Sequence, residues 1–486
     1  MDNVTCRSSK FSAGRDQWRV RRIDSRSART SADCDRVKKF LSSGAWSLLN
    51  QFVRVGSLAA ITIALGRHFG PQLFGSLAVG FALVRVFAVV TTFGLDRVLV
   101  RHLVDREEQA AAIVREAFWL KLGIAFLSYL TMLGLIFTFE RGDTLLLAIA
   151  ALAGGGLLFQ AGDAFDYAFQ AQGRFALSFF GRGVPILLST TLKIGAILVN
   201  APLLFFAALE TVEAAIIAAA LFVVYRRTIS GSVSAKSAGT VAWRRLLVEG
   251  LPLLLSALAV MIYMRSDIIM LGKMAGYQVA GIYAAASQIS EACVLFPVAL
   301  MPALFPILVR WRRCGPEFYH RQFERLFLLA AAAGLLFSLT LTFGATTIVT
   351  FIFGSNYHSA ANILIIHAWT ILFIFIGITQ SGYDVIEGLT WFAMFRTFIG
   401  ALLNIGLNLI LIPRHGAVGS AVATLVAQIF SSVLLNALHP GTRPILRMQF
   451  MSILLWPALR GLCRKDSAPK SASWQELANR VTLADG

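Results

Sequence analysis

The sequence has few charged residues and no long polar segment between its apolar runs. Of its 486 residues, 14% are charged and 57% are hydrophobic. Soluble domains usually carry about 25% charged residues, so this composition excludes an ordinary water-soluble protein. The longest stretch between two apolar runs is the loop at 226–246. That length leaves no room for the catalytic domain that a membrane-embedded glycosyltransferase or polymerase usually has.

Signatures of catalysis and of metal binding are also missing. Gly154–Gly156 is not followed by Lys and Ser or Thr, so it is no phosphate-binding loop. The seven histidines do not cluster. The cysteines have no metal-ligand spacing, and we expect free thiols. These five residues are Cys6, Cys34, Cys293, Cys314 and Cys463. We therefore predict a protein that is not an enzyme and has no resident metal or cofactor.

Long apolar runs fill most of the chain instead. They are 21 to 30 residues long, enough for a helix to cross a bilayer, and each is continuous rather than alternating. The sequence thus predicts an all-α integral membrane protein with about 12 transmembrane helices. The predicted spans are 45–66, 76–96, 117–139, 144–169, 177–200, 203–225, 247–271, 279–308, 325–349, 361–384, 388–412 and 417–438.

Basic residues alternate between the two sides of these spans. One set of loops holds Arg97, Arg101, Arg106, Arg115, Arg174, Arg226, Arg227, Lys236, Arg244, Arg245, Arg310, Arg312, Arg313, Arg321 and Arg325. The other set holds only Arg67, Arg141, Lys273 and Arg414. Because cytosolic loops carry the excess of Lys and Arg, the richer side and both termini are predicted to be cytosolic.

The net charge of +18 would also be compatible with a nucleic-acid-binding protein, but its distribution is not. Much of the charge lies in residues 1–42, and most of the rest lies in the short loops. That pattern is typical of membrane topology and of attraction to anionic lipids. We expect 1–42 to be a disordered basic cytosolic tail, and no nucleic-acid partner.

The chain also contains an internal repeat. A shift of 206 residues superposes LGRHFGPQLFGSLA (Leu65–Ala78) on LGKMAGYQVAGIYA (Leu271–Ala284), with six identical positions. The Ser- and Gly-rich stretch at 227–246 is typical of a linker at mid-chain. The repeat predicts two pseudo-symmetric six-helix lobes of the same orientation, 43–226 and 247–438. Residues 439–486 are expected to be a cytosolic tail with an amphipathic helix lying in the membrane interface.

Ionisable side chains inside the predicted spans are the candidate functional residues. Arginines there would suit a diphosphate or an acidic sugar, because guanidinium groups bind phosphate in a bidentate manner. The predicted cationic cavity consists of Arg54, Arg85, Arg182 and Arg265. Carboxylates inside a membrane usually mark ion pathways, so four are candidates for gating or ion coupling. These are Asp163, Asp166, Asp267 and Glu291.

Two of these candidates have alternatives that the residues leave open. Arg85 and Glu291 are equivalent under the repeat, so they could form a salt bridge that gates a cleft between the lobes. Each could equally pair within its own lobe. Arg265 and Asp267, in the stretch YMRSD, could be cavity residues or a pair that reaches the membrane interface.

Four motifs resemble one known family. They are LGRHFGPQLFGSLA with FGLDRVLVRHL (Phe93–Leu103), YMRSDIIMLG with GIYAAASQISE and LFPIL (Leu304–Leu308), FGSNYHSAANILII (Phe353–Ile366), and NIGLNLILIPRHGAVGSAVATLVAQ (Asn404–Gln428). In this order they resemble the bacterial polysaccharide-transport flippases, the Wzx-type branch of the MOP superfamily. The resemblance covers about 45–438. Of the candidate residues, only Arg265 and Asp267 lie in a pattern that recurs in the family.

The resemblance implies a V-shaped bundle that flips undecaprenyl-diphosphate-linked oligosaccharide across the inner membrane by alternating access. Such transport serves exopolysaccharide, O-antigen or capsule biosynthesis, and its energy source is expected to be an H⁺ or Na⁺ gradient. Implied partners are the lipid-linked oligosaccharide, membrane lipids, and the polymerase and chain-length regulator of the same pathway. Two other functions stay open: an ion-coupled multidrug or small-solute antiporter of the same superfamily, and a membrane-embedded glycosyltransferase or polymerase.

Overall fold

The computed structural model describes residues 15–139, 142–228 and 243–454. Throughout these ranges the chain is helical or in short turns, without a strand. Ten of the helices are long and apolar enough to cross a membrane, and their side chains are often exposed, as with Phe343, Phe351 and Trp119. Large apolar side chains on the outside are stable only in lipid. The prediction of an all-α multi-pass membrane protein is confirmed.

The chain divides into two compact units, Met1–Arg265 and Ser266–Gly486. The division falls inside α10 (Trp243–Met274). The other elements of unit 1 are α1 (Arg15–Thr92), α2 (Leu95–Asp105), η1 (Glu107–Gln109), α3 (Ala110–Phe139), α4 (Thr144–Gly154), α5 (Gly156–Phe159), η2 (Gln160–Gly162), α6 (Asp163–Ala171), α7 (Phe175–Ser178), η3 (Phe179–Gly183), α8 (Val184–Leu198) and α9 (Leu203–Thr228).

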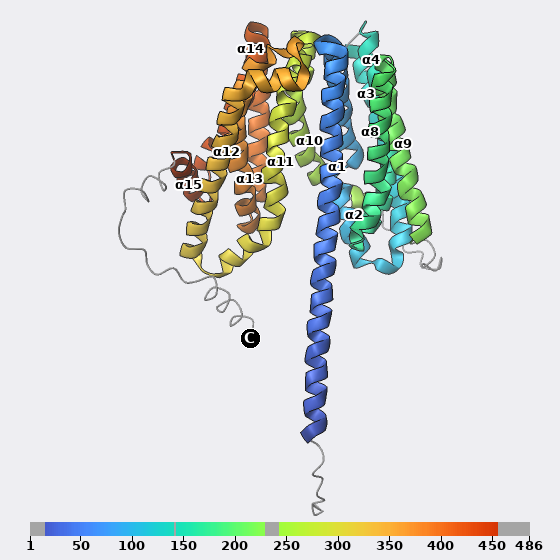
Figure 1. Cartoon of the computed structure of the whole chain (residues 1–486), viewed down its shortest axis with the longest axis vertical. Coiled ribbons are helices and arrows are strands. Elements are labelled where there is room, and N and C mark those ends of the chain that lie inside the picture. The colour runs from blue at the N-terminus through green and yellow to red at the C-terminus, as the bar shows by residue number, and fades with distance from the viewer. Residues whose placement is uncertain (1–14, 140–141, 229–242, 455–486) are drawn as a thin grey trace, which may run out of the picture. The chain divides into compact units, whose positions relative to one another are not determined.

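Unit 2 is built from fewer elements and has few short helices, whereas the longest helix, α1, belongs to unit 1 (Figure 1). Its elements are α11 (Tyr277–Arg313), α12 (Pro316–Phe353), η4 (Ser355–Tyr357), α13 (Ala360–Ile386), α14 (Thr390–Ser432), η5 (Leu434–Ala437) and α15 (Arg443–Ile453). The linker predicted at 227–246 lies mostly outside the described residues. The domain limits and the V-shaped arrangement stay predictions.

Single glycines turn the chain where two predicted spans meet within one helix. In α1, Gly70 has φ 72° and ψ 175°, and in α14, Gly416 has φ 55° and ψ −134°. Both conformations are open mainly to glycine. Dividing α1 and α14 at these residues turns the ten long helices into twelve segments, which fall on the twelve predicted spans. The count of twelve membrane crossings itself stays a prediction.

The repeat in the sequence has a counterpart in the backbone. Gly276, between α10 and α11, has φ 90° and ψ 164°, close to the conformation of Gly70 at the equivalent position. Leu65 and Leu271, also equivalent, are both buried. A glycine-only turn followed by an apolar helix therefore recurs in the two units at the predicted offset.

Helix α15 packs against unit 2 rather than standing apart from it. Ile445 and Gln449 are completely buried, and Ile445 belongs to an apolar core with Phe323 and Phe327 of α12. Its opposite face exposes Arg447 and Phe450. Whether this face lies in the membrane interface stays a prediction, as does the structure of the tail that follows.

Candidate functional site

Unit 1 contains a polar cavity of about 440 Å³ among its apolar helices. Its charged lining consists of Arg85 from α1, Asp163 from α6, Arg182 from η3, and Glu210 and Glu213 from α9. Gln160 and Thr92 add neutral polar groups. Side chains of both signs thus line one space, together with apolar residues such as Phe81 and Met261. A cavity of this kind can hydrogen-bond a hydroxyl-rich ligand and also hold an anion at its guanidinium groups.

Asp163 lies at the centre of an ion-pair network beside this cavity. Its Oδ1 atom is 2.6 Å from Nη2 of Arg182, and its Oδ2 atom is 3.7 Å from Nζ of Lys121. The same Arg182 nitrogen lies 3.4 Å from Oδ2 of Asp166, which also accepts a hydrogen bond from Gln170. Two cations therefore offset two carboxylates. Pairing of this kind is what allows charges to be buried in an apolar unit.

Local helix geometry places Arg182 in this network. Residues Phe179–Gly183 form a turn of π-helix, which widens the helix and often marks functional positions. Gly181 lies so close to α9 that a Cβ atom there would come within 2.5 Å of Leu221. The sequence FFGRG thus combines a close helix contact with an arginine that points to the carboxylates of α6.

A second buried ion-pair cluster joins α8 to α9. Nζ of Lys193 lies 2.6 Å from Oε1 of Glu210 and 2.7 Å from Oε2 of Glu213, and Ser189 donates a hydrogen bond to the same Glu213 oxygen. Lys193 is only 5% exposed. Because both glutamates also line the cavity, this cluster and the Asp163 network lie on the wall of one space.

The buried carboxylate of unit 2 has a different environment. Asp267 is 5% exposed, and every printed partner of its two oxygens is a neutral donor. Tyr283 and Thr424 donate to Oδ2 at 2.6 and 2.5 Å, and Asn408 donates to Oδ1 at 2.6 Å. Asn404 extends the network to Thr424 and Asn408. The described residues show no Lys or Arg in a salt bridge with Asp267.

Three helices contribute to the Asp267 site. Asp267 comes from α10, Tyr283 from α11, and Asn408 and Thr424 from the two segments of α14 that meet at Gly416. Within the described part of the chain, the buried Oδ1 atom of Asn408 accepts no hydrogen bond. Carboxylate, amide and hydroxyl oxygens are the ligands that hard cations prefer, so the donor set suits Na⁺, and the carboxylate alone suits a proton.

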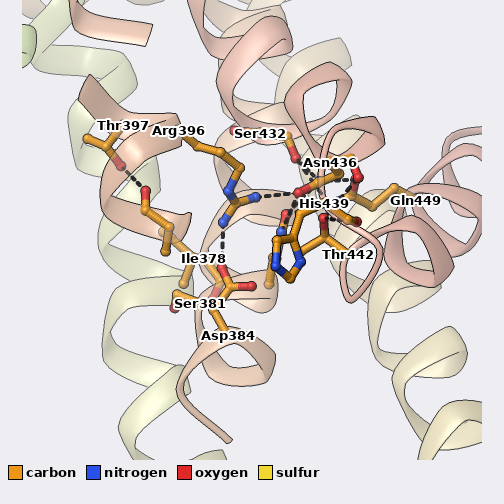
Figure 2. A network of polar contacts seen from close by, with 12 residues as sticks. Ile378, Ser381, Asp384, Arg396, Thr397, Ser432, Asn436, His439, Thr442 and Gln449 are labelled. Carbon is orange, nitrogen blue, oxygen red and sulfur yellow. Dashed lines mark hydrogen bonds and ion pairs between the residues drawn. The ribbon is translucent and has the colours of Figure 1, made fainter. Parts of the chain in front are cut away.

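Unit 2 also holds a carboxylate that is paired. Asp384 of α13 forms an ion pair with Arg396 of α14, and Nη1 of Arg396 donates to Asn436 at 2.7 Å (Figure 2). Asn436 in turn donates to Gln449 of α15 at 3.0 Å. All four side chains are at least 93% buried. The network joins α15 to α13 and α14, and Asp384 differs from Asp267 in having an arginine as its partner.

The predicted site residues fall into separate groups. Arg85, Asp163 and Arg182 line the unit 1 cavity, and Asp166 joins them through Arg182. The other predicted residues are Arg54, which is exposed and donates to Gln51 at 2.9 Å, the half-buried Arg265 and Glu291, and Asp267 in its own site. The roles predicted for all eight residues, and the pairing of Arg85 with Glu291, stay predictions.

Several residues of these sites were not predicted. Lys121, Glu210 and Glu213 carry charges inside predicted spans, so the signal that identified the other candidates was present for them too. Asn404 and Asn408 are four residues apart within an apolar run, a spacing that places both on one helix face. Tyr283 and Thr424 gave no signal of their own, because both residue types are common in membrane helices.

Solved structures define the class of protein. The chain is similar to a lipid II flippase MurJ in an inward closed conformation, with a TM-score of 0.63, 14% identity, and coverage of 89% of this chain and 95% of that one. It is similar to an inward-facing multidrug resistance MATE family transporter, with a TM-score of 0.64, 12% identity, and coverage of 86% of this chain and 96% of that one. It is also similar to a MOP superfamily transporter from Pyrococcus furiosus, with a TM-score of 0.58, 13% identity, and coverage of 88% of this chain and 97% of that one. The protein is therefore a multi-pass membrane protein with the fold of MOP superfamily transporters.

The sequence itself defines the family. The family model described as "Polysaccharide biosynthesis protein" matches residues 40–311, more than half of the chain. No curated protein matches the chain. The chain belongs to the polysaccharide biosynthesis protein family, and the predicted family and fold class are confirmed.

Proposed function

We propose that the protein flips undecaprenyl-diphosphate-linked oligosaccharide repeat units across the bacterial inner membrane by alternating access. The observation that carries the proposal is the charged cavity of unit 1, in a chain of the polysaccharide biosynthesis family. Arg85 and Arg182 would hold the diphosphate, and the neighbouring carboxylates and Gln160 would accept and donate hydrogen bonds to sugar hydroxyl groups. The polyprenyl tail needs no polar contact and can stay in lipid.

The unit 1 ion pairs would make this cavity usable at a low energetic cost. In the resting protein Arg182 is paired with Asp163, so its charge is balanced. A diphosphate that enters would share the guanidinium group with Asp163, and Lys121 would remain to balance that carboxylate. Exchanging one pairing for another avoids an isolated charge in a medium of low dielectric constant.

We further propose that an H⁺ or Na⁺ gradient drives transport through Asp267. Its carboxylate receives hydrogen bonds from α11 and from α14, so the ion that it binds alters contacts of three helices at once. An ion can drive a conformational change only if it binds the two states with different affinity. A site shared by three helices supplies such a difference, because helix movement would change the ligand set.

An antiporter of the multidrug type is the second candidate function. It is favoured by the similarity to MATE family transporters and by the three carboxylates in the cavity, which could attract a cation. Arg85 and Arg182 in the same cavity oppose a cationic cargo. The flippase proposal also includes an inner-membrane location, cytosolic termini, and cooperation with a polymerase and a chain-length regulator.

Reconstitution of the full-length protein in liposomes tests the proposal. The probe is undecaprenyl diphosphate carrying an amino sugar labelled with a fluorophore that external dithionite reduces. We expect protein to expose the inner-leaflet pool to dithionite many times faster than empty liposomes do, and Arg85→Gln to lose this effect. Probe flipping at the rate of empty liposomes, together with ion-driven uptake of rhodamine 6G, would instead assign the antiporter function.

A further inference from the structure

A second cavity of unit 1 is apolar and lies on the other side of the polar cavity's wall. It has a volume of about 820 Å³ and is lined by α3, the α5–α6 segment and α9. Phe159 lines both cavities, whereas Gln160 and Asp163 face the polar one and Leu158 and Gly162 face the apolar one. We call the second cavity the α3–α9 groove. Neither the proposed transport nor its ion site uses it.

Small and aromatic side chains shape this groove. On α9 its lining recurs at Ala215, Ala218, Ala219 and Phe222, a single helix face. The alanines leave space open, and at the floor η2 approaches α9 so closely that a Cβ atom on Gly162 would lie 2.8 Å from that of Ala218. Three aromatic rings pack against the floor. The ring centres of Phe118 and Phe165 lie 5.6 Å apart, and those of Phe165 and Phe222 lie 5.4 Å apart.

One end of the groove is basic. Arg115 of α3 and Tyr225 of α9 line that end. The next residue, Arg226, places its guanidinium carbon 5.8 Å from the ring centre of Phe222. Arg115 and Arg226 are both exposed, so a ligand headgroup can reach their charges. Two guanidinium groups at the mouth of an apolar groove complement a ligand with an anionic head and an apolar tail.

The length of the groove matches one leaflet of a bilayer. Its lining on α9 runs from Ala215 to Tyr225, which is about 15 Å at the rise of an α-helix. The hydrocarbon core of a bilayer is about 30 Å thick, so the groove covers about half of it. The basic end carries Arg115 and Arg226, on the side that the distribution of Lys and Arg assigns to the cytosol.

We propose that the α3–α9 groove binds one anionic phospholipid of the cytosolic leaflet. The phosphate lies between Arg115 and Arg226, and an acyl chain fills the space over Gly162 and beside Ala219. A phospholipid is favoured over the transported lipid because the proposed partners of the transported diphosphate, Arg85 and Arg182, line the polar cavity and not the groove. The bound lipid completes the packing of α3, α6 and α9.

Native mass spectrometry of the full-length protein tests this proposal. The detergent-purified protein is titrated with phosphatidylglycerol and, separately, with phosphatidylethanolamine, and the first bound lipid is counted. We expect one phosphatidylglycerol to bind at least about tenfold more tightly than phosphatidylethanolamine, because both carry a phosphate but the ammonium group of phosphatidylethanolamine cancels its net charge. Phosphatidylglycerol should also raise the melting temperature of the protein.

Two variants target the head and the chain of the lipid. Arg115→Gln should weaken phosphatidylglycerol binding about tenfold or more and phosphatidylethanolamine binding less, because the phosphate of phosphatidylethanolamine is already offset by its own ammonium group. Ala219→Trp fills the groove from an exposed position and should remove the binding of both lipids. Matched controls are Arg174→Gln, an exposed arginine of the same predicted side, and Val223→Trp, an exposed position on α9 outside the groove lining. Both controls should bind as the wild type does.

Four results would overturn the proposal. They are equal affinity of the wild type for the two phospholipids, unchanged binding by either groove variant, an equal loss in the controls, and displacement of phosphatidylglycerol by an equimolar amount of undecaprenyl phosphate. The last result would assign the groove to the transported lipid. Because none of these readouts involves transport, they are independent of the flippase proposal.

Discussion

The two units bury carboxylates in opposite ways. In unit 1, Asp163 and Asp166 face Arg182 and Lys121, and Glu210 and Glu213 face Lys193, so each of these four carboxylates has a partner of opposite sign. In unit 2, Asp267 receives hydrogen bonds from Tyr283, Asn408 and Thr424 instead. Neutral donors stabilise a carboxylate but leave its charge in place.

This difference separates two tasks. A network whose charges are already balanced can form a stable polar surface in a membrane, and it can exchange one partner for a passing ligand. A carboxylate without a cation, buried in apolar surroundings, gains the most from a proton or a metal ion. In the proposed function, unit 1 therefore holds the substrate and unit 2 the ion. Asp384, paired with Arg396, shows that unit 2 also contains a paired carboxylate.

Neutralising Asp267 should have the largest effect on transport. Asp267→Asn keeps the size of the side chain and one acceptor oxygen, but it replaces the other oxygen with an NH2 group and removes the charge that would bind the coupling ion. We expect flipping to fall about 100-fold or more, equivalent to at least about 2.7 kcal/mol, while the protein keeps its melting temperature. Asp163→Asn in parallel should lower flipping less and stability more. Equal effects of the two changes on both readouts would remove the distinction between the units.

Breaking a unit 1 pair should mainly cost stability. Arg182→Gln leaves Asp163 and Asp166 with one cation, and removal of one partner from a buried pair costs about 3 kcal/mol. The double variant Arg182→Gln with Asp163→Asn should recover most of that loss. Thermal unfolding in detergent measures the stability of each variant, and Arg97→Gln, at an exposed position, is the control. A double variant less stable than either single one would refute charge balance as the reason for the pairing.

Removing a neutral ligand at the ion site should give a graded effect. Asn408→Ala deletes a donor to Asp267 and an oxygen available to a cation. We expect the ion concentration for half-maximal flipping to rise about tenfold, or about 1.4 kcal/mol, with the maximal rate retained. Asn362→Ala, at an exposed position of α13, is the matched control. A fall in maximal rate with no change in ion requirement would place Asn408 outside ion binding.

The glycine turns that the two units share should respond alike and weakly. Gly70→Ala and Gly276→Ala meet no neighbouring atom within 4 Å, so only backbone strain opposes them, about 1 kcal/mol each. Gly406→Ala, in a helical conformation and equally uncrowded, should cost nothing or stabilise slightly. The melting temperatures of the three variants and of the wild type test this prediction. A lower melting temperature for only one of the two variants would mean that Gly70 and Gly276 are not equivalent in the repeat.

Much of the fold could be predicted because hydrocarbon imposes simple rules on sequence. Apolar runs long enough to cross a bilayer identified the helices, and the repeated glycine of LGRHFG and LGKMAG identified equivalent turns. What the runs did not reveal is that α1 and α14 each continue through a predicted loop. A single glycine in a left-handed conformation is enough to divide such a helix, and its φ angle cannot be read from composition.

The candidate site was predicted in part. Charges in apolar runs pointed to Arg85, Asp163 and Arg182, which do line one cavity. Their pairing was not predictable, because Arg182 reaches Asp163 only through the π-helical turn of η3. The surroundings of Asp267 come from three helices that are far apart in the chain, and its partners Tyr283 and Thr424 are neutral. A search for charges alone could not identify them.

The rate of flipping under an imposed ion gradient tests the central claim most directly. Proteoliposomes with wild-type protein and the labelled lipid-linked sugar are compared with and without an inward gradient of Na⁺ or of H⁺, and Asp267→Asn is measured beside them. We predict that one of the two gradients accelerates net flipping by the wild type and leaves Asp267→Asn unchanged. Net flipping that responds to neither gradient, or an Asp267→Asn protein that responds as the wild type does, would contradict ion-driven transport through unit 2.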